Sequence, residues 1–147
     1  MFNGFYGIAV GIAVLIIIWP ISYRMLGNEP FEFDAAGQPG TFEKQFAFYS
    51  DILKLILSLA SASIVLLVGL RKSEQLPPSF ASPLFLLAMS IFYGIICMAY
   101  LASEYEGYRH GKTTYTRFKY SKNLAFGNGS AICFFVGYAW LIFIVTR

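Results

Sequence analysis

The sequence predicts an all-α polytopic membrane protein, a four-transmembrane-helix bundle that forms a single domain over residues 1–147. Two observations carry this prediction. Hydrophobic residues make up 57% of the chain and charged residues only 13%, whereas soluble domains contain about 25% charged residues. The charges also cluster, and they leave four long uncharged apolar runs between them. An uncharged run of roughly 18 residues is long enough to cross a bilayer as a helix.

The first predicted span covers about residues 4–24. No charged side chain occurs before Arg24. Trp19 and Tyr23 come near the end of the run, and aromatic residues followed by arginine are typical of an anchor at the membrane–water interface. We therefore expect a membrane helix rather than a cleaved signal peptide, which would carry basic residues ahead of its apolar part.

The second predicted span covers about residues 47–70, and its uncharged part is shorter than that of the other spans. Residues 55–70 would extend about 24 Å as a helix, against about 30 Å for a hydrocarbon core. Lys54 and Arg71 flank this part, and both can extend their charged ends toward the polar phase. Apolar residues at helical spacing upstream predict an amphipathic lead-in that begins near Glu43.

The third and fourth predicted spans cover about residues 82–103 and 122–146. Ser82 followed by Pro83 is typical of a helix start, with an N-cap and then proline at the first helical position. The first loop is rich in proline and glycine, which favours a connector, although a functional loop remains open. The predicted loops cover 25–43, 71–81 and 104–121.

The number of spans and the distribution of basic residues predict an orientation. An even number of spans places both termini on one side of the membrane. Three lysine and arginine residues lie on the side of the termini and eight lie on the other side. Because basic residues favour the cytoplasmic side, we expect both termini outside and the first and third loops in the cytoplasm. The expected location is a bacterial inner (plasma) membrane.

Small and polar residues fall on one face of each of the last three spans when the residues are placed at 100° intervals. Such a face is poorly suited to lipid, because larger apolar side chains would serve better there. The candidate helix-packing or pore-lining residues are Asp51, Lys54, Ser58, Ser61, Ala62 and Gly69 in the second span, Ser90 and Gly94 in the third, and Gly129, Cys133 and Gly137 in the fourth.

Two interpretations of these faces stay open. In lipid, helices associate through close backbone approach and interhelical hydrogen bonds, and small or hydroxylated residues permit both. Alternatively, copies of the second span around an axis would line a water-filled path with the hydroxyls of Ser58 and Ser61, and with Asp51 and Lys54 at its mouth. The two interpretations are compatible if the second span packs between subunits.

The sequence argues against an enzyme. The single histidine, His110, lies four residues from Glu106, and two such groups are too few for a zinc site, which needs three or four ligands. Motifs for a catalytic triad, a phosphate loop or a CxxC pair are absent. We therefore predict no catalytic residues, no metal, no cofactor and no nucleic-acid partner. Cys97 and Cys133 favour buried apolar roles, and a disulfide between them is conceivable.

Basic residues alternate with aromatic ones in the third loop, close to the fourth span. Such a segment would contact an anionic lipid surface, and a nucleotide or a protein could use the same residues. A plain interfacial anchor is the simpler interpretation. The residues of this candidate lipid or ligand patch are Arg109, His110, Lys112, Arg117, Lys119 and Lys122.

Three segments carry a resemblance to a known group of proteins. They read FYSDILKLILSLASASIVLLVG, YEGYRHGK and CFFVGYAW, and together they resemble small, largely uncharacterised bacterial four-span membrane proteins. Some relatives lie near bacterial defence genes as membrane effectors. The resemblance implies an oligomer that compromises or conducts across a membrane, and it implies no catalytic residues.

Together these observations predict a non-enzymatic membrane protein that self-associates through small and serine-rich helix faces, as a pore or a membrane effector. Its expected partners are the lipid bilayer and further copies of itself or another membrane protein. The alternative is an accessory or assembly subunit of a larger membrane complex.

Overall fold

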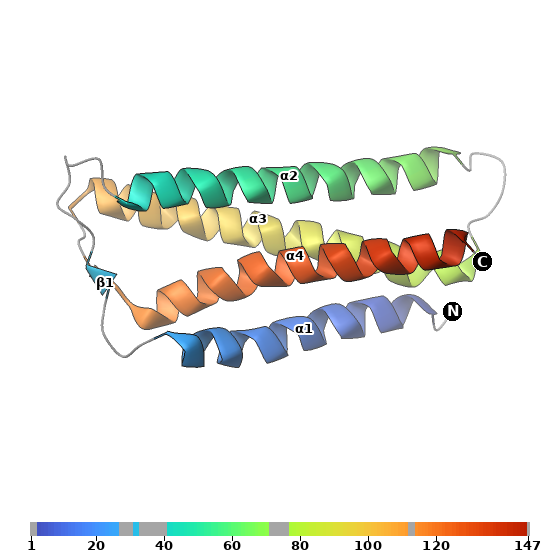
Figure 1. Ribbon diagram of the computed structural model, residues 1–147, viewed down its shortest axis with the longest axis horizontal. Coiled ribbons are helices and arrows are strands. Elements are labelled where there is room, and N and C mark those ends of the chain that lie inside the picture. Colours follow the sequence, from blue (N-terminus) through green and yellow to red (C-terminus); the bar gives the residue numbers. More distant parts are fainter. Residues whose placement is uncertain (1–2, 27–30, 33–40, 71–76, 112–113, 147) are drawn as a thin grey trace.

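The computed structural model describes residues 3–26, 31–32, 41–70, 77–111 and 114–146 (Figure 1). Four long helices run side by side along the longest axis of the molecule, and the first and last described residues lie at the same end. The helices are α1 (Asn3–Met25), α2 (Thr41–Leu70), α3 (Ala81–Arg109) and α4 (Arg117–Val145), and a short 3-10 helix, η1 (Pro78–Phe80), precedes α3. All four are long and apolar enough to cross a membrane. The predicted all-α four-helix fold is confirmed.

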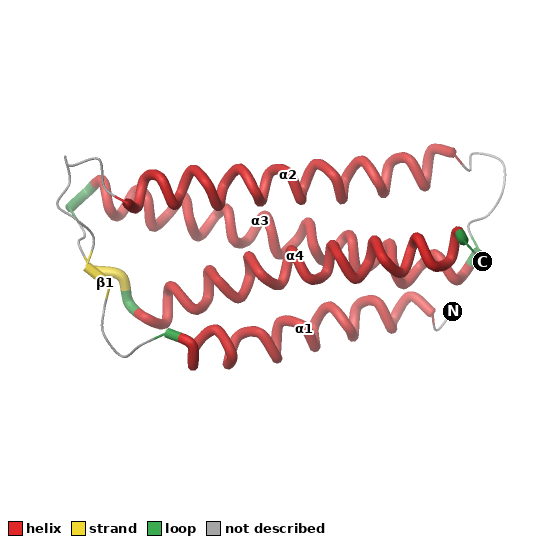
Figure 2. The backbone as a smooth tube through the Cα atoms, viewed as in Figure 1, coloured by secondary structure: helices red, strands yellow, loops and turns green. Residues whose placement is uncertain are grey.

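The observed helices extend further than the predicted spans at the end of the bundle opposite the termini (Figure 2), called the loop end below. Helix α3 continues to Arg109 and α4 begins at Arg117, so most of the segment predicted as a third loop is helical. The periodic aromatic residues of this segment explain the difference. Phe46 of α2 stacks on Tyr105 of α3, with ring centroids 5.0 Å apart, which extends the contact of the two helices past the apolar part of the chain.

Two short strands join the first and third connections at the loop end. Strand β1 (Phe31–Glu32) pairs antiparallel with β2 (Thr114–Tyr115). The sequence predicted loops in both places, because two residues are too few to show a strand alternation. Most of the first loop, and with it the alternative of a functional loop there, lies outside the described residues.

Helices α3 and α4 form the centre of the bundle. Helix α1 packs against both of them, whereas α2 packs mainly against α3 and less against α4. One apolar cluster joins α2, α3 and α4 around Ile56, Leu87 and Phe134. A second cluster joins α1, α3 and α4 around Leu86 and Cys133. Helix α2 is therefore the peripheral helix of the four.

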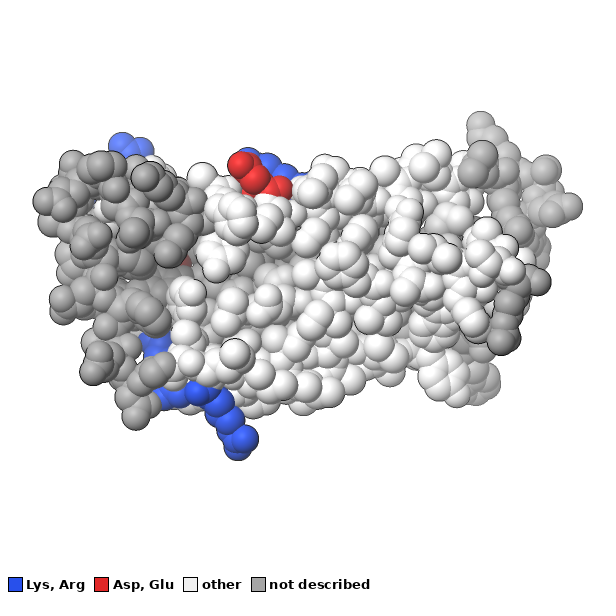
Figure 3. Space-filling view, in the orientation of Figure 1, with Lys and Arg blue, Asp and Glu red and all other residues white. Residues whose placement is uncertain are grey.

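The apolar part of the bundle matches a bilayer in length. The segment from Ser82 to Tyr100 of α3 spans about 27 Å at 1.5 Å per residue, close to the hydrocarbon core of about 30 Å. The amine of Lys122 lies over the ring of Tyr100, 3.5 Å from its centroid, and marks the polar boundary at the loop end. Figure 3 shows basic side chains of one face near this end, an acidic and a basic group together on its upper flank, and no charged group on the remaining described surface.

Candidate functional site

The small residues of α3 and α4 meet one another inside the bundle. The Ser90 hydroxyl donates a hydrogen bond to the main-chain oxygen of Ser130 at 2.7 Å, and the Ser130 hydroxyl donates to the main-chain oxygen of Ser90 at 2.8 Å. Both serines are fully buried. Because each hydroxyl reaches the opposite backbone, the two helices must lie very close together at this point.

Glycines make this close contact possible. A Cβ atom added to Gly94 would lie 2.9 Å from a methyl carbon of Leu57, and one added to Gly137 would lie 3.1 Å from the Cβ of Leu86. Both distances are shorter than ordinary van der Waals contact, so a side chain at either position would require the neighbouring residue to shift. Of the remaining candidates in these two helices, Gly129 and Cys133 are also buried.

Two further buried polar contacts were not predicted from the sequence. The Tyr93 hydroxyl donates to the main-chain oxygen of Gly11 in α1 at 3.0 Å, and the Cys97 thiol lies 3.4 Å from the main-chain oxygen of Asn123. Both cysteines are free and buried, so the structure shows no disulfide between them. Tyr93 lies on the small-residue face of α3, and that position was the available signal for its role.

The small-residue face of α2 lies outside the bundle. Helix α2 buries Leu53, Ile56 and Ala60 against its neighbours. Residues two positions apart in a helix point about 200° away from each other, so Ser58 and Ala62, on either side of Ala60, point away from the bundle. The whole set of candidates in this helix is exposed in the single chain, namely Asp51, Lys54, Ser58, Ser61, Ala62 and Gly69. Below, these six residues are called the outer face of α2.

The hydroxyls on the outer face differ from the nearby hydroxyl of Ser63. The Ser63 side chain donates to the main-chain oxygen of Leu59 at 2.8 Å, which is the usual way for a helical serine to satisfy its hydroxyl within its own helix. Ser58 and Ser61 make no hydrogen bond with another described residue. A Cβ added to Gly69 would meet nothing within 4 Å. This face therefore holds polar and small groups that are exposed in the described part of the chain.

An ion pair lies at one end of the outer face. The Lys54 amine is 3.4 Å from a carboxylate oxygen of Asp51, and the side chains are 63% and 77% exposed. Residues three apart on a helix are close enough to pair, but such exposed pairs contribute little to stability. Figure 3 shows one acidic and one basic group side by side on a flank of the bundle that is otherwise uncharged.

Three residues of the predicted basic patch contact neighbouring helices instead of forming a common surface. Arg117 lies over the Tyr23 ring at 4.3 Å from its centroid, and its Nε donates to the main-chain oxygen of Tyr23 at 3.0 Å. The guanidinium thus caps the last turn of α1, where carbonyl groups lack helical partners and favour a positive charge. Lys122 covers the Tyr100 ring of α3.

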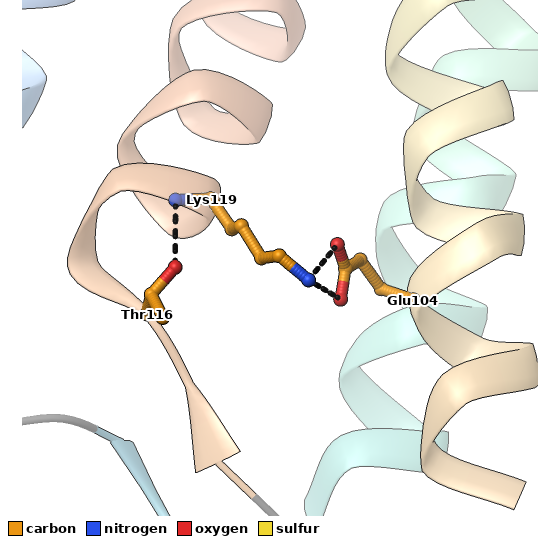
Figure 4. Close-up of polar contacts among 3 residues, drawn as sticks. All are labelled: Glu104, Thr116 and Lys119. Atoms are coloured by element: carbon orange, nitrogen blue, oxygen red, sulfur yellow. Dashed lines mark hydrogen bonds and ion pairs between the residues drawn. The ribbon is translucent and has the colours of Figure 1, made fainter. Parts of the chain in front are cut away.

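The third of these residues, Lys119, forms an ion pair with Glu104 of α3 (Figure 4). Its amine lies 3.2 and 3.4 Å from the two carboxylate oxygens, and Glu104 is only 19% exposed. The Thr116 hydroxyl accepts a hydrogen bond from the main-chain nitrogen of Lys119 at 3.4 Å and caps the start of α4. The first turns of α4 therefore join it to α1 and α3. Arg109 and His110 are exposed at the end of α3, and Lys112 lies outside the described residues.

Within the described part of the chain, no three histidine, cysteine, aspartate or glutamate side chains come close enough to hold a metal ion. The predictions that the protein has no catalytic residues and no cofactor remain predictions.

A scan against protein-family models, a search of curated proteins and a search of solved structures each found no match to this chain. The resemblance to small bacterial four-span proteins therefore stays a prediction from three short segments. The structure establishes the fold alone, a membrane-embedded bundle of four apolar helices.

Proposed function

We propose that this integral membrane protein self-associates through the outer face of α2. The observation that carries the proposal is the placement of Ser58 and Ser61, which point away from the bundle and lack hydrogen-bond partners among the described residues. A hydroxyl in the hydrocarbon core is more favourable when it has a partner, and small residues allow a second helix to approach closely. Another copy of the chain would supply both.

The contrast with α1 supports the proposal. The surface of α1 that faces outward carries large aliphatic residues such as Ile12, Ile16 and Ile17, which are well suited to acyl chains. On α2, large residues such as Leu55 and Leu59 are also exposed and flank the outer face, and Val65 lies within it. The part of α2 furthest from the bundle thus carries more small and hydroxylated residues than the outward surface of α1.

The mass of the purified particle in mild detergent tests the proposal. We expect a homo-oligomer of defined size for the native chain and a monomer for the double variant Ser58→Leu, Ser61→Leu. Ala13→Leu is the matched control, because Ala13 is an exposed small residue of α1 outside the proposed interface, and this variant should remain oligomeric. A monomeric native chain would contradict the proposal, and a monomer that co-purifies with another membrane protein would favour the alternative of an accessory subunit.

The stronger form of the proposal is a pore in which Ser58 and Ser61 line the path between copies of α2. We expect the native protein to release ions from liposomes and the double leucine variant to insert without releasing them. Hydroxyls and a charged pair at the mouth are groups that suit a hydrated path. Equal leak from the native and variant proteins would exclude a path lined by these two serines, and the particle mass would still report on self-association.

We also infer that the loop end faces the cytoplasm. The support is the concentration of basic side chains there, among them Arg24, Arg109 and Arg117 on three different helices, because basic residues next to spans favour the cytoplasmic side. A cysteine introduced at Gly111 tests this orientation in a variant that lacks Cys97 and Cys133. We expect an impermeant maleimide to label this cysteine only after the membrane has been opened. Labelling in intact cells would show that the loop end faces outward instead.

A further inference from the structure

The geometry of Asp51 and Lys54 points to an exchange of ion pairs between copies, in which the Asp51 carboxylate of one copy binds the Lys54 amine of the next. This inference rests on the proposed self-association through the outer face of α2. It adds the residues that pair between copies and the relative direction of the copies. It predicts that neighbouring copies lie parallel and in register, with their α2 helices at the same depth.

The first step of the argument is the position of the two residues around the helix. Relative to Ser58, at the centre of the outer face, Asp51 lies about 20° to one side and Lys54 about 40° to the other, at 100° per residue. The acidic and the basic group thus occupy opposite flanks of one face. Both point away from the bundle, since their side chains are mostly exposed.

The second step is the symmetry of a homo-oligomer. When copies surround an axis that is parallel to their helices, one flank of each α2 meets the opposite flank of its neighbour. The Asp51 flank therefore faces the Lys54 flank of the next copy, in a dimer and in a larger ring alike. Like charges do not meet in this arrangement, so the outer face is complementary to itself in charge as well as in shape.

The third step is the depth of the pair in the membrane. Leu57 of α2 packs on Gly94 of α3, and Phe46 stacks on Tyr105. Asp51 lies between these two levels, near the level of Tyr100.

Tyr100 is the residue covered by the Lys122 amine, which places the pair at the polar boundary of the bundle. A less polar environment than bulk water strengthens the attraction between opposite charges. Copies inserted in the same direction bring their pairs to the same depth, whereas an inverted copy would place its pair at the far side of the membrane.

Charge reversal in two differently tagged chains tests the exchange. Asp51→Lys leaves two basic groups on the face of one chain, and Lys54→Asp leaves two acidic groups on the other. Each variant alone should self-associate at least about tenfold more weakly than the native chain, because like charges then meet across the interface. Co-expressed, the two variants should associate with each other, and tandem purification through both tags should recover the mixed oligomer.

A matched control and two contrary outcomes complete the test. Arg24→Glu reverses an exposed charge at the same end of the bundle, on α1, and should leave self-association unchanged. If both single variants self-associate like the native chain, or if the co-expressed variants form no mixed oligomer, the proposed exchange of ion pairs is wrong. The proposed self-association would still stand. If the native chain is itself a monomer, the proposed function and the exchange fail together. Recovery in the mixture also shows that both variants fold and insert.

Discussion

Ser90 and Ser130 bind each other's backbone across the contact between α3 and α4. Each hydroxyl donates to the main-chain oxygen of the other residue, and the two hydroxyl oxygens are 3.4 Å apart. Both residues are fully buried. The contact therefore fixes the separation of the two central helices, on which α1 and α2 are packed.

Removing one of these hydroxyls should weaken the bundle. We expect Ser90→Ala to lower the free energy of unfolding by about 0.6 kcal/mol, the average measured for interhelical hydrogen bonds in a membrane protein, and by about 1.7 kcal/mol at most. Ser63→Ala is the matched control, because the Ser63 hydroxyl bonds only within its own helix, and it should change the free energy little. Unfolding in mixed detergent micelles measures both free energies. Equal effects of the two substitutions would show that the α3–α4 contact does not depend on the hydrogen bonds between Ser90 and Ser130.

Alanine substitutions should have opposite effects on stability at a closely packed glycine and at an exposed one. Gly94→Ala places a methyl group 2.9 Å from Leu57 and 3.1 Å from the Ser130 hydroxyl and should lower the melting temperature, because both side chains must shift. Gly69→Ala meets no neighbouring atom within the described chain and should stabilise the helix by up to about 1 kcal/mol. Thermal melting followed by circular dichroism compares the two. A stabilising effect of Gly94→Ala would contradict the packing of Leu57 on this glycine.

The cap on α1 should also contribute to stability. We expect Arg117→Met to cost about 1–2 kcal/mol, since it removes both the hydrogen bond to the Tyr23 carbonyl and the contact with the Tyr23 ring. Arg24→Met removes an exposed arginine of the same region and serves as control. A melting temperature that falls equally in both variants would mean that Arg117 acts only through net charge at this end.

The buried thiols should be protected from reaction. Cys97 is 3% exposed and Cys133 is fully buried between helices, so a maleimide should label neither in liposomes and both after denaturation. A cysteine introduced at Ala13, which is exposed, gives the rate for a thiol on the lipid-facing surface when the reagent is membrane-permeant. Rapid labelling of either native thiol in the folded protein would show that the α3–α4 contact opens.

The sequence was sufficient to predict the four helices, because charge-free apolar runs of sufficient length have few alternatives in a membrane. It also indicated which faces of α3 and α4 are small. Ser90 contacts Ser130 there, and Gly137 lies against Leu86. It could not distinguish the buried face of α3 from the exposed face of α2, since both show the same pattern of small and hydroxylated residues. That distinction depends on which helices are neighbours, and the peripheral place of α2 follows from packing between distant segments.

The contacts of the basic residues likewise could not be predicted from the sequence. Arg117 and Lys119 belong to a segment whose alternation of basic and aromatic residues suggested a shared surface. In the structure one caps α1 and the other pairs with Glu104 of α3. The partners are distant in the chain, so spacing alone could not identify them.

Energy transfer between donor-labelled and acceptor-labelled copies in liposomes tests most directly whether the outer face of α2 joins copies of the chain. At high dilution in lipid, the native protein and Ala13→Leu should show transfer well above that expected for random proximity, and the double variant Ser58→Leu, Ser61→Leu should fall to the random level. Transfer at the random level for the native protein, or undiminished transfer for the double variant, would contradict the account.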